Sequence, residues 1–151
     1  MTGKTHLLGG ALAAMLLAPN SIEGSSLILL GSLISDIDHP KSTIGKYVPL
    51  IPRLLPHRGL THSMIFCVLC YLLNPFLSYG VGVHIMLDMM TTSGVKLFYP
   101  LPNNIRFPLA KFVKTNGIFE ALLEFLLIIV IFYMTYEKYI AKNLFFLIKN
   151  N

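Results

Sequence analysis

Hydrophobic positions along the chain fall into five apolar runs separated by polar turns and loops. The runs cover residues 5–18, 26–36, 60–73, 76–91 and 117–139. None of them alternates apolar and polar residues as a half-buried strand does, and no internal repeat is visible. The pattern predicts an all-α fold, a small helical membrane bundle of about five helices that forms a single domain over residues 1–151.

Short polar residues mark where two of these helices are expected to begin. Ser25 or Ser26 follows the turn "PNSIEG" and is a candidate N-cap for the second run. Thr61 is a candidate N-cap for the third run. Pro40 ends the second helix, because the residue before a proline is biased away from helical geometry.

The composition is that of a membrane protein. The chain is 54% hydrophobic and 13% charged, whereas soluble domains carry about 25% charged residues. Its net charge of +5 would suggest nucleic acid in a soluble protein. Here the basic residues lie between apolar runs, where they contact anionic lipid headgroups, and a nucleic-acid partner is not expected. Cys67 and Cys70 lie within "IFCVLCYLL" and are interpreted as small buried hydrophobes.

Run length and loop charge give a topology. Only residues 117–139 approach the ~20 residues that cross a bilayer, so the shorter runs must tilt, thin the bilayer or stop part-way. If the first four runs each cross, the N-terminus and both long loops, 37–58 and 92–116, lie on one side. Most Lys and Arg residues fall on that side, which the positive-inside rule places in the cytoplasm. The sequence thus predicts a multi-pass protein.

Candidate metal ligands gather at one end of the predicted helices. His6 opens the first run and Asp36 closes the second. His62 lies at the start of the third, whereas His84 and Asp88 lie in the last turns of the fourth. In the topology above these positions share the loop side. The spacing of "HIMLD" also puts His84 and Asp88 on one helix face, where they could hold an ion or simply contact each other.

Histidine and carboxylate ligands without cysteine suit a catalytic divalent metal more than a thiolate structural site. More than four candidates indicate two ions, with zinc expected and manganese or iron as alternatives. Paired metals about 3.5–4 Å apart activate water and clamp the oxygens of a phosphoester. The predicted metal ligands are His6, Asp36, His62, His84 and Asp88.

A second group of polar residues carries candidate catalytic roles. Arg58 could hold a phosphate bidentately. His39 or His57 could orient a group or donate a proton, since histidine titrates near neutral pH. Asp38 adds a hard oxygen ligand beside them. Glu120 opens the last run and could be a ligand, a general base or an acid that faces the helix dipole.

The ordered motifs "TH", "DIDHP", "HRGLTHS", "HIMLD" and "GIFE" resemble a known family over nearly the whole chain. They are similar to the bacterial inner-membrane metal-dependent hydrolases described as LexA-regulated or LexA-binding. The resemblance implies a membrane-embedded hydrolase of the bacterial inner membrane. The chain is also distantly similar to the zinc-dependent phospholipases C, whose ligands follow the order His, Asp, His, His-x-x-x-Asp. It departs from them in being much shorter and in lacking a further His/Glu pair on a late helix.

The resulting hypothesis is a metal-dependent hydrolase of a phosphoester in a phospholipid or lipid-linked substrate. A metal-activated water would attack phosphorus at the cytoplasmic interface while Arg58 and Arg106 hold the phosphate. Two other classes stay open. A metal or proton transporter would line a path with polar residues, and an interaction or regulatory protein would use the metal structurally. Oligomerisation stays open as well.

Overall fold

The computed structural model describes residues 1–108, 110 and 113–149, with side chains up to residue 141 except at the two gaps. Its long helices are α1 Gly3–Leu17, α2 Ile22–Ile34, α4 Met64–Leu73, α5 Pro75–Met89 and α6 Ile118–Lys149. Shorter elements are η1 Ser35–Asp38, η2 Gly45–Tyr47, α3 Ile51–Leu54 and η3 Leu60–His62. The only β-type pairing in the described part of the chain is an isolated bridge between Val95 and Ile105. The all-α prediction is therefore confirmed, and each apolar run corresponds to one long helix.

Helix α2 begins earlier than the sequence pattern predicts. The Ser21 hydroxyl accepts a hydrogen bond from the Gly24 backbone N–H at 2.9 Å, and Ser21 has the extended backbone of an N-cap. Ser25 and Ser26 already lie inside the helix, so their predicted capping role is wrong. The apolar pattern missed the first turn because Glu23 and Gly24 interrupt it.

Helices α2 and α5 approach each other closely through glycine. A Cβ atom on Gly31 would collide with the Leu77 carbonyl and would lie 3.0 Å from the Gly80 Cα atom. Small residues at such a crossing let two backbones meet, as is common between membrane helices. Ile28 and Val81 are fully buried on either side of this crossing. The contact places the end of α2 beside the last turns of α5.

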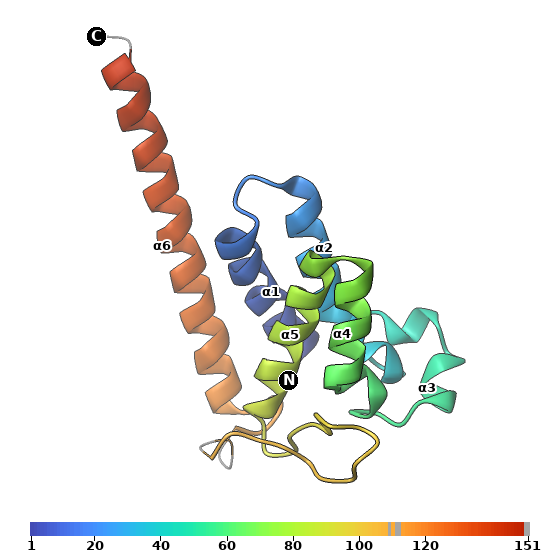
Figure 1. Ribbon diagram of the computed structural model, residues 1–151. Coiled ribbons are helices and arrows are strands. Elements are labelled where there is room, and N and C mark those ends of the chain that lie inside the picture. Colours follow the sequence, from blue (N-terminus) through green and yellow to red (C-terminus); the bar gives the residue numbers. More distant parts are fainter. Residues whose placement is uncertain (109, 111–112, 150–151) are drawn as a thin grey trace.

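Helix α6 lies along α1 at one flank of the bundle (Figure 1). Near its start, the Thr5 hydroxyl donates to Glu124 at 2.7 Å. Further along, the Lys138 ammonium donates to the Met15 carbonyl at 3.5 Å. The two helices therefore run side by side in the same direction, and α6 continues well past the end of α1.

Among the described residues, α6 is the only helix long and apolar enough to cross a membrane. Its apolar part, Ile118–Ala141, has 24 residues and spans about 36 Å, more than the ~30 Å of a hydrocarbon core. The other long helices have 10–15 residues and span about 15–23 Å. Helix lengths therefore do not support the predicted multi-pass topology.

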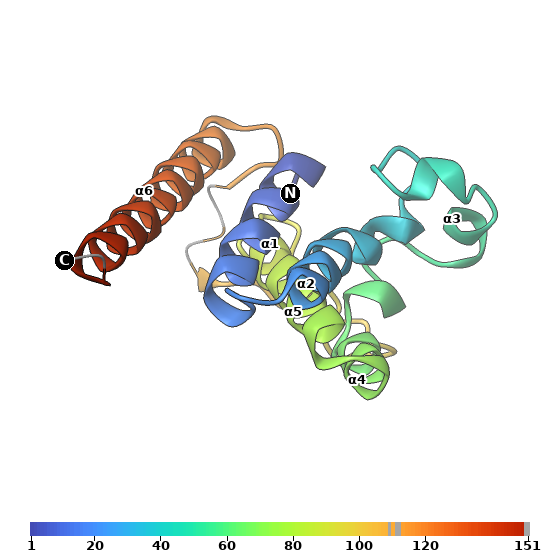
Figure 2. The ribbon, with the colours of Figure 1, turned by 90° about the horizontal axis from the view of Figure 1, so that it is seen from above.

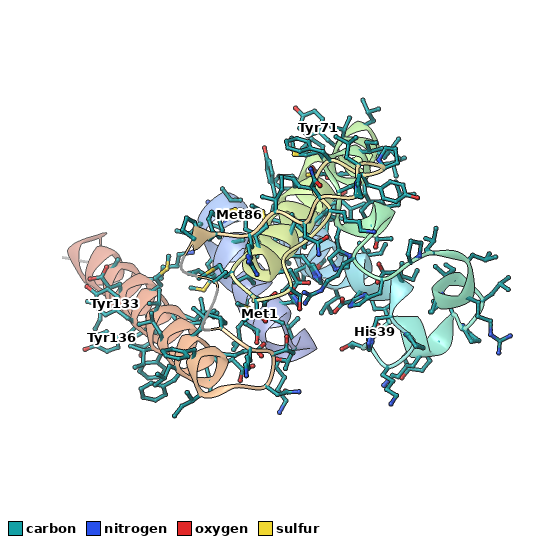
Figure 3. All side chains as sticks on the ribbon, turned by 90° about the horizontal axis from the view of Figure 1, so that it is seen from below. Met1, His39, Tyr71, Met86, Tyr133 and Tyr136 are labelled. Carbon is teal, nitrogen blue, oxygen red and sulfur yellow. The ribbon has the colours of Figure 1, made fainter. Side chains whose placement is uncertain are left out.

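The outer surface of the bundle is nevertheless apolar. Leu72 and Leu73 on α4 expose 76% and 80% of their surface, and Phe132 on α6 exposes 74%. Tyr71 and Tyr133 point outward from the same two helices (Figure 3). Exposed large apolar side chains gathered along a helix mark a membrane or protein contact.

Candidate metal centre

The structure brings the five predicted metal ligands together at one end of the bundle. They come from four elements: His6 from α1, Asp36 from η1, His62 from η3, and His84 with Asp88 from α5. These elements meet in one layer because α1 and α4 begin there, α2 and α5 end there, and α5 packs against the other three helices (Figure 1). All five side chains are buried or partly buried. Residues separated by more than 80 positions in the sequence thus form one cluster.

The centre of the cluster is a contact between two imidazole rings. The Nε2 atoms of His62 and His84 lie 3.1 Å apart. The Asp36 Oδ1 atom is 3.6 Å from both of these nitrogens. The Asp88 Oδ2 atom is 3.5 Å from His62 Nε2. Four ligand atoms from three elements therefore surround one small volume.

Hydrogen bonds to the far side of each ring determine its tautomer. His84 Nδ1 lies 2.7 Å from the Ser32 carbonyl oxygen, which only accepts, so Nδ1 carries the proton. His62 Nδ1 lies 3.1 Å from the Thr61 hydroxyl, whose own proton goes to Asp38 at 2.6 Å. His62 Nδ1 must therefore donate as well. In neutral rings both Nε2 lone pairs then face each other, an arrangement that requires a proton or a metal cation between them.

His6 extends the cluster toward α1. Its ring stacks on that of His84, with centroids 3.6 Å apart and an interplanar angle of 9°. The ring is fully buried, yet neither nitrogen makes a hydrogen bond among the described residues. Nε2 lies 3.4 Å from Asp88 Oδ1. A buried imidazole without hydrogen bonds is costly, and a cation at Nε2 would satisfy it.

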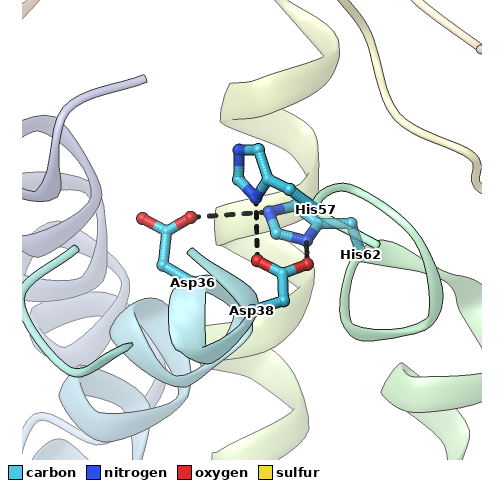
Figure 4. A group of neighbouring side chains, drawn as sticks. All are labelled: Asp36, Asp38, His57 and His62. Carbon is cyan, nitrogen blue, oxygen red and sulfur yellow. Dashed lines mark hydrogen bonds and ion pairs between the residues drawn. The ribbon is translucent and has the colours of Figure 1, made fainter. Parts of the chain in front are cut away.

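Asp38 lies beside His57 and on the Nδ1 side of His62, opposite the Nε2 atom that faces the other ligands (Figure 4). One oxygen lies 2.8 Å from His57 Nδ1. The other accepts from the Arg58 backbone N–H at 3.0 Å and the Thr61 hydroxyl at 2.6 Å, and it lies 3.4 Å from His62 Nδ1. A carboxylate behind a ligand histidine fixes the ring and raises its basicity. Asp38 is thus placed to orient His57 and His62.

Thr61 is a residue whose role the sequence pattern missed. It does not cap α4, because Ser63 accepts the hydrogen bond from the Phe66 backbone N–H instead. The Thr61 side chain is turned inward to Asp38. The Ser32 carbonyl, which orients His84, was missed too, and a backbone acceptor leaves no signal in a sequence. The "HRGLTH" spacing pointed to the right loop but not to this internal bond.

The neighbouring charges shift the pKa values of Asp36, Asp38 and His62. Burial alone would raise the pKa of Asp36, but His62 and the other nearby imidazoles lower it to about 2. Burial would lower the pKa of His62, but hydrogen bonds to Asp36, Asp38 and Asp88 raise it to about 10. The pKa of Asp38 is likewise held well below its usual range by His57 and His62, against the effect of burial. Without a metal, a proton on His62 relieves the contact between the two Nε2 atoms.

A cavity of about 500 Å³ opens beside this cluster. Its walls include the ligands Asp36 and Asp88 and the predicted catalytic residues His39, His57 and Arg58. The rest of the lining is mostly polar, namely Thr2, Lys41, Ser42, Ser93, Thr115 and Asn116, together with Met1 and Gly3. Seen from the site end of the bundle, Met1 and His39 lie on this face (Figure 3). The cavity therefore joins candidate metal ligands to positively charged and hydrogen-bonding groups.

The two cavity histidines lie next to each other. The rings of His39 and His57 have centroids 4.6 Å apart. His57 donates from Nδ1 to Asp38, which leaves its Nε2 atom as an acceptor. Burial and the neighbouring His57 lower the pKa of His39. One imidazole is therefore fixed by a carboxylate, and the other favours its neutral form.

Arg58 holds the cavity wall near Asp88. Its Nη2 atom is 3.3 Å from Asp88 Oδ2, and Nη1 donates to the Thr91 hydroxyl and the Gly94 carbonyl at 3.2 Å each. Its backbone lies in the left-handed region, with φ of 61°, where the bond to Asp38 holds it. The guanidinium is thus fixed at the cavity while keeping N–H groups beyond these three bonds.

Two predicted residues lie apart from this cavity. The Arg106 guanidinium donates to the Thr92 carbonyl at 2.9 Å, is exposed, and is not part of the cavity lining. Glu120 is buried and accepts from the Thr2 backbone N–H at 2.5 Å and the Thr5 hydroxyl at 2.6 Å. Its contacts join the start of α6 to the start of α1. The structure therefore brings neither side chain to the candidate metal ligands.

The amino group of Met1 is buried and forms an ion pair with Asp88 Oδ1. This oxygen is also the one nearest to His6 Nε2. A positive group at this position is compensated by the carboxylate and would compete with a metal for it. No sequence motif marks Met1 as part of the site.

Comparison with known proteins gives a family and a location. A family profile described as "YdjM inner membrane protein" matches residues 1–148. The uncharacterized protein YvsG of Bacillus subtilis is 31% identical over 142 residues, which cover 81% of this chain and 86% of that protein. The inner membrane protein YdjM of Escherichia coli is 32% identical over 145 residues, which cover 77% of this chain and 74% of that protein. No solved structure matches the chain. The two YdjM names state an inner-membrane location, and none of the three names states an activity.

Proposed function

This chain belongs to the YdjM inner membrane protein family, and we propose that it is a metal-dependent hydrolase of lipid phosphoesters. The substrate class is a phospholipid or a lipid-linked phosphate, and the reacting bond lies at the cytoplasmic membrane interface. The proposal rests on the residues of the cluster and its cavity, together with the membrane location of the family.

The contact between His62 and His84 carries the proposal. Both rings donate from Nδ1, so their Nε2 atoms face each other at 3.1 Å, and a metal cation would take the place of the proton that His62 otherwise carries there. Asp36 and Asp88 supply carboxylate oxygens within 3.6 Å. Imidazole and carboxylate donors without thiolate fit zinc, and also manganese or iron.

The donor set is larger than one structural ion needs. His6, Asp36 and His84 have ligand atoms within 4.8 Å of one another, and so do His62, His84 and Asp88. A structural zinc ion takes four ligands and leaves no open position. Five ligands, two of which (Asp36 and Asp88) line the open cavity, favour two ions, which is the arrangement suited to phosphate chemistry.

The chain supplies the positive wall that a phosphate requires. Arg58 lines the cavity with its guanidinium held by Asp88, Thr91 and Gly94, and Lys41 adds a second positive group. A planar guanidinium is suited to two phosphate oxygens. Arg58 would therefore hold the phosphate against the metal ligands. Arg106 lies outside the cavity and has no part in holding the phosphate.

His57 is the group best placed to move a proton. Asp38 fixes its tautomer and leaves the Nε2 atom as an acceptor at the cavity wall. His57 would take a proton from the attacking water as its oxygen bonds to phosphorus, and would return it to the leaving oxygen when the phosphoester bond breaks. A divalent cation held by the cluster would act as a Lewis acid on the water and the phosphoryl oxygens.

The membrane supplies the reason for a lipid substrate. Helix α6 is long and apolar enough to cross the bilayer, and the shorter helices would enter it part-way beside α6, with the metal ligands at the interface. Exposed apolar side chains on α4 and α6 would face the acyl chains. A soluble phosphoester would gain nothing from this placement, whereas a lipid headgroup would reach the cavity directly.

Hydrolysis by the purified chain tests the proposal. The full chain, loaded with zinc or manganese in lipid nanodiscs, should release phosphate or a phosphorylated headgroup from phospholipids or lipid diphosphates. His84→Ala should abolish release, Arg58→Lys should raise KM, and Glu137→Gln, an exposed change on α6, should leave the rate unchanged. Bound metal without hydrolysis of any of these lipids would contradict the proposal and favour a structural metal.

A further inference from the structure

Residues 41–56 leave the bundle after η1 and return just before the "HRGLTH" turn. They contain η2 and α3, and no residue of α3 is buried. Tyr47, Leu50 and Leu54 expose 76%, 64% and 70% of their surface. Because α3 contributes nothing to the core, packing within the chain does not account for these large apolar side chains.

The same stretch is positively charged. It contains Lys41, Lys46 and Arg53, all exposed, and no acidic residue. The Lys46 ammonium lies 4.9 Å from the centre of the Tyr47 ring. Tyrosine and leucine beside lysine and arginine suit the interface of an anionic membrane, where rings reach the headgroup level and basic side chains extend to the phosphates.

Residues 41–56 lie beside the cavity, on the side of the bundle opposite α6. Seen along the bundle, α6 lies at one flank and α3 at the opposite flank (Figure 2). Lys41, at the start of the stretch, lines the cavity together with His39 and His57. The cavity therefore lies between the membrane-spanning helix and the exposed basic and apolar surface.

We propose that residues 41–56 are a second membrane-docking element that binds the anionic lipid surface beside the cavity. Charge complementarity selects this occupant, since the stretch offers cations and no anions to its partner. The family is one of inner membrane proteins and α6 has spanning length, so lipid headgroups would be present at high local concentration. Contact at both flanks fixes the tilt of the bundle and turns the cavity toward the headgroups.

The absence of tryptophan from the chain gives a direct test. Tyr47→Trp introduces a single indole at an exposed position. The full chain is reconstituted in phosphatidylcholine vesicles with and without phosphatidylglycerol, using lipids brominated along the acyl chain as quenchers. The expected result is blue-shifted emission and quenching that is stronger in the anionic vesicles. Emission of a hydrated indole without quenching would overturn the proposal.

Two further variants separate lipid docking from other causes. In the Tyr47→Trp chain, Lys46→Glu with Arg53→Glu should remove the extra quenching in anionic vesicles. If the extra quenching persists in this variant, the charge argument is overturned. Tyr133→Trp, placed instead on α6, should be quenched in both kinds of vesicle and shows that reconstitution succeeded. The readout depends on neither metal nor turnover, so it is independent of the proposed hydrolysis.

Discussion

Asp38→Asn is the most informative single change, because it removes a charge while keeping shape. The Asp38 oxygens accept hydrogen bonds from Arg58 N–H at 3.0 Å and Thr61 at 2.6 Å, and a third bond joins His57 at 2.8 Å. An asparagine oxygen can keep the first two. Its amide nitrogen then faces His57, which can accept by changing tautomer. The loop should therefore keep its fold.

What Asp38→Asn removes is the negative charge behind His62, whose Nδ1 lies 3.4 Å from the carboxylate. Loss of such a partner typically weakens metal binding about 10–100-fold, or about 1.4–2.7 kcal/mol. Asp38→Ala should also lower the melting temperature, since each buried donor left without an acceptor costs about 1–3 kcal/mol.

A chromophoric zinc chelator measures the difference by competition in detergent. The wild-type chain, Asp38→Asn and the exposed control Glu137→Gln are titrated side by side, with thermal unfolding as the check on fold. We expect weaker zinc binding in Asp38→Asn alone. Unchanged zinc affinity in a folded Asp38→Asn protein would refute the view that Asp38 supports a metal ligand.

Further predictions concern the ligands, pH and the helix crossing. Asp36→Ala and His84→Ala should abolish metal retention, measured as metal per chain, while membrane fractionation shows normal insertion. Without metal, the His62 pKa is raised to about 10, so the ring carries a proton at neutral pH that a bound metal must displace. Metal affinity, measured by chelator titration, should therefore rise about tenfold per pH unit below pH 10. An affinity independent of pH would contradict this. Gly31→Ala should overpack the helix crossing, which typically lowers the free energy of unfolding by ~1–3 kcal/mol, and so should lower the melting temperature. Gly82→Ala, with open space around its Cβ, should leave the melting temperature unchanged.

The helix content and the position of the polar residues could be predicted from the sequence. Apolar runs of 10 or more residues fix where helices form, and alternating direction places their ends in two layers. His6 and Asp88 could therefore be assigned to one layer without a structure. The N-cap at Ser21 could not, because several serines follow one another and only backbone geometry selects among them.

The details of the site depend on tertiary contacts that leave no local pattern. The Ser32 carbonyl determines the tautomer of His84. Every residue has a backbone carbonyl, so the sequence does not show which one will contact the ring. Thr61 could cap a helix or bond Asp38, and only the path of the loop decides. Arg106 and Arg58 look equivalent in the sequence, yet only Arg58 lines the cavity.

Membrane topology was the weakest prediction. Apolar runs such as residues 60–73 suggested crossings, but α4 has only 10 residues, and among the described helices only α6 has spanning length. Hydropathy reports how apolar a helix is and not how far it reaches. The exposed apolar face of the short helices and their length together favour partial insertion.

Metal content per chain tests the central claim most directly. The full chain is purified gently in detergent without chelators, and its zinc, manganese and iron are measured by elemental mass spectrometry beside His62→Ala. The account predicts about two ions per wild-type chain, as in two-metal phosphoesterases, and loss of metal in the variant. A wild-type chain that holds no metal, even after incubation with zinc, manganese or iron, would contradict it.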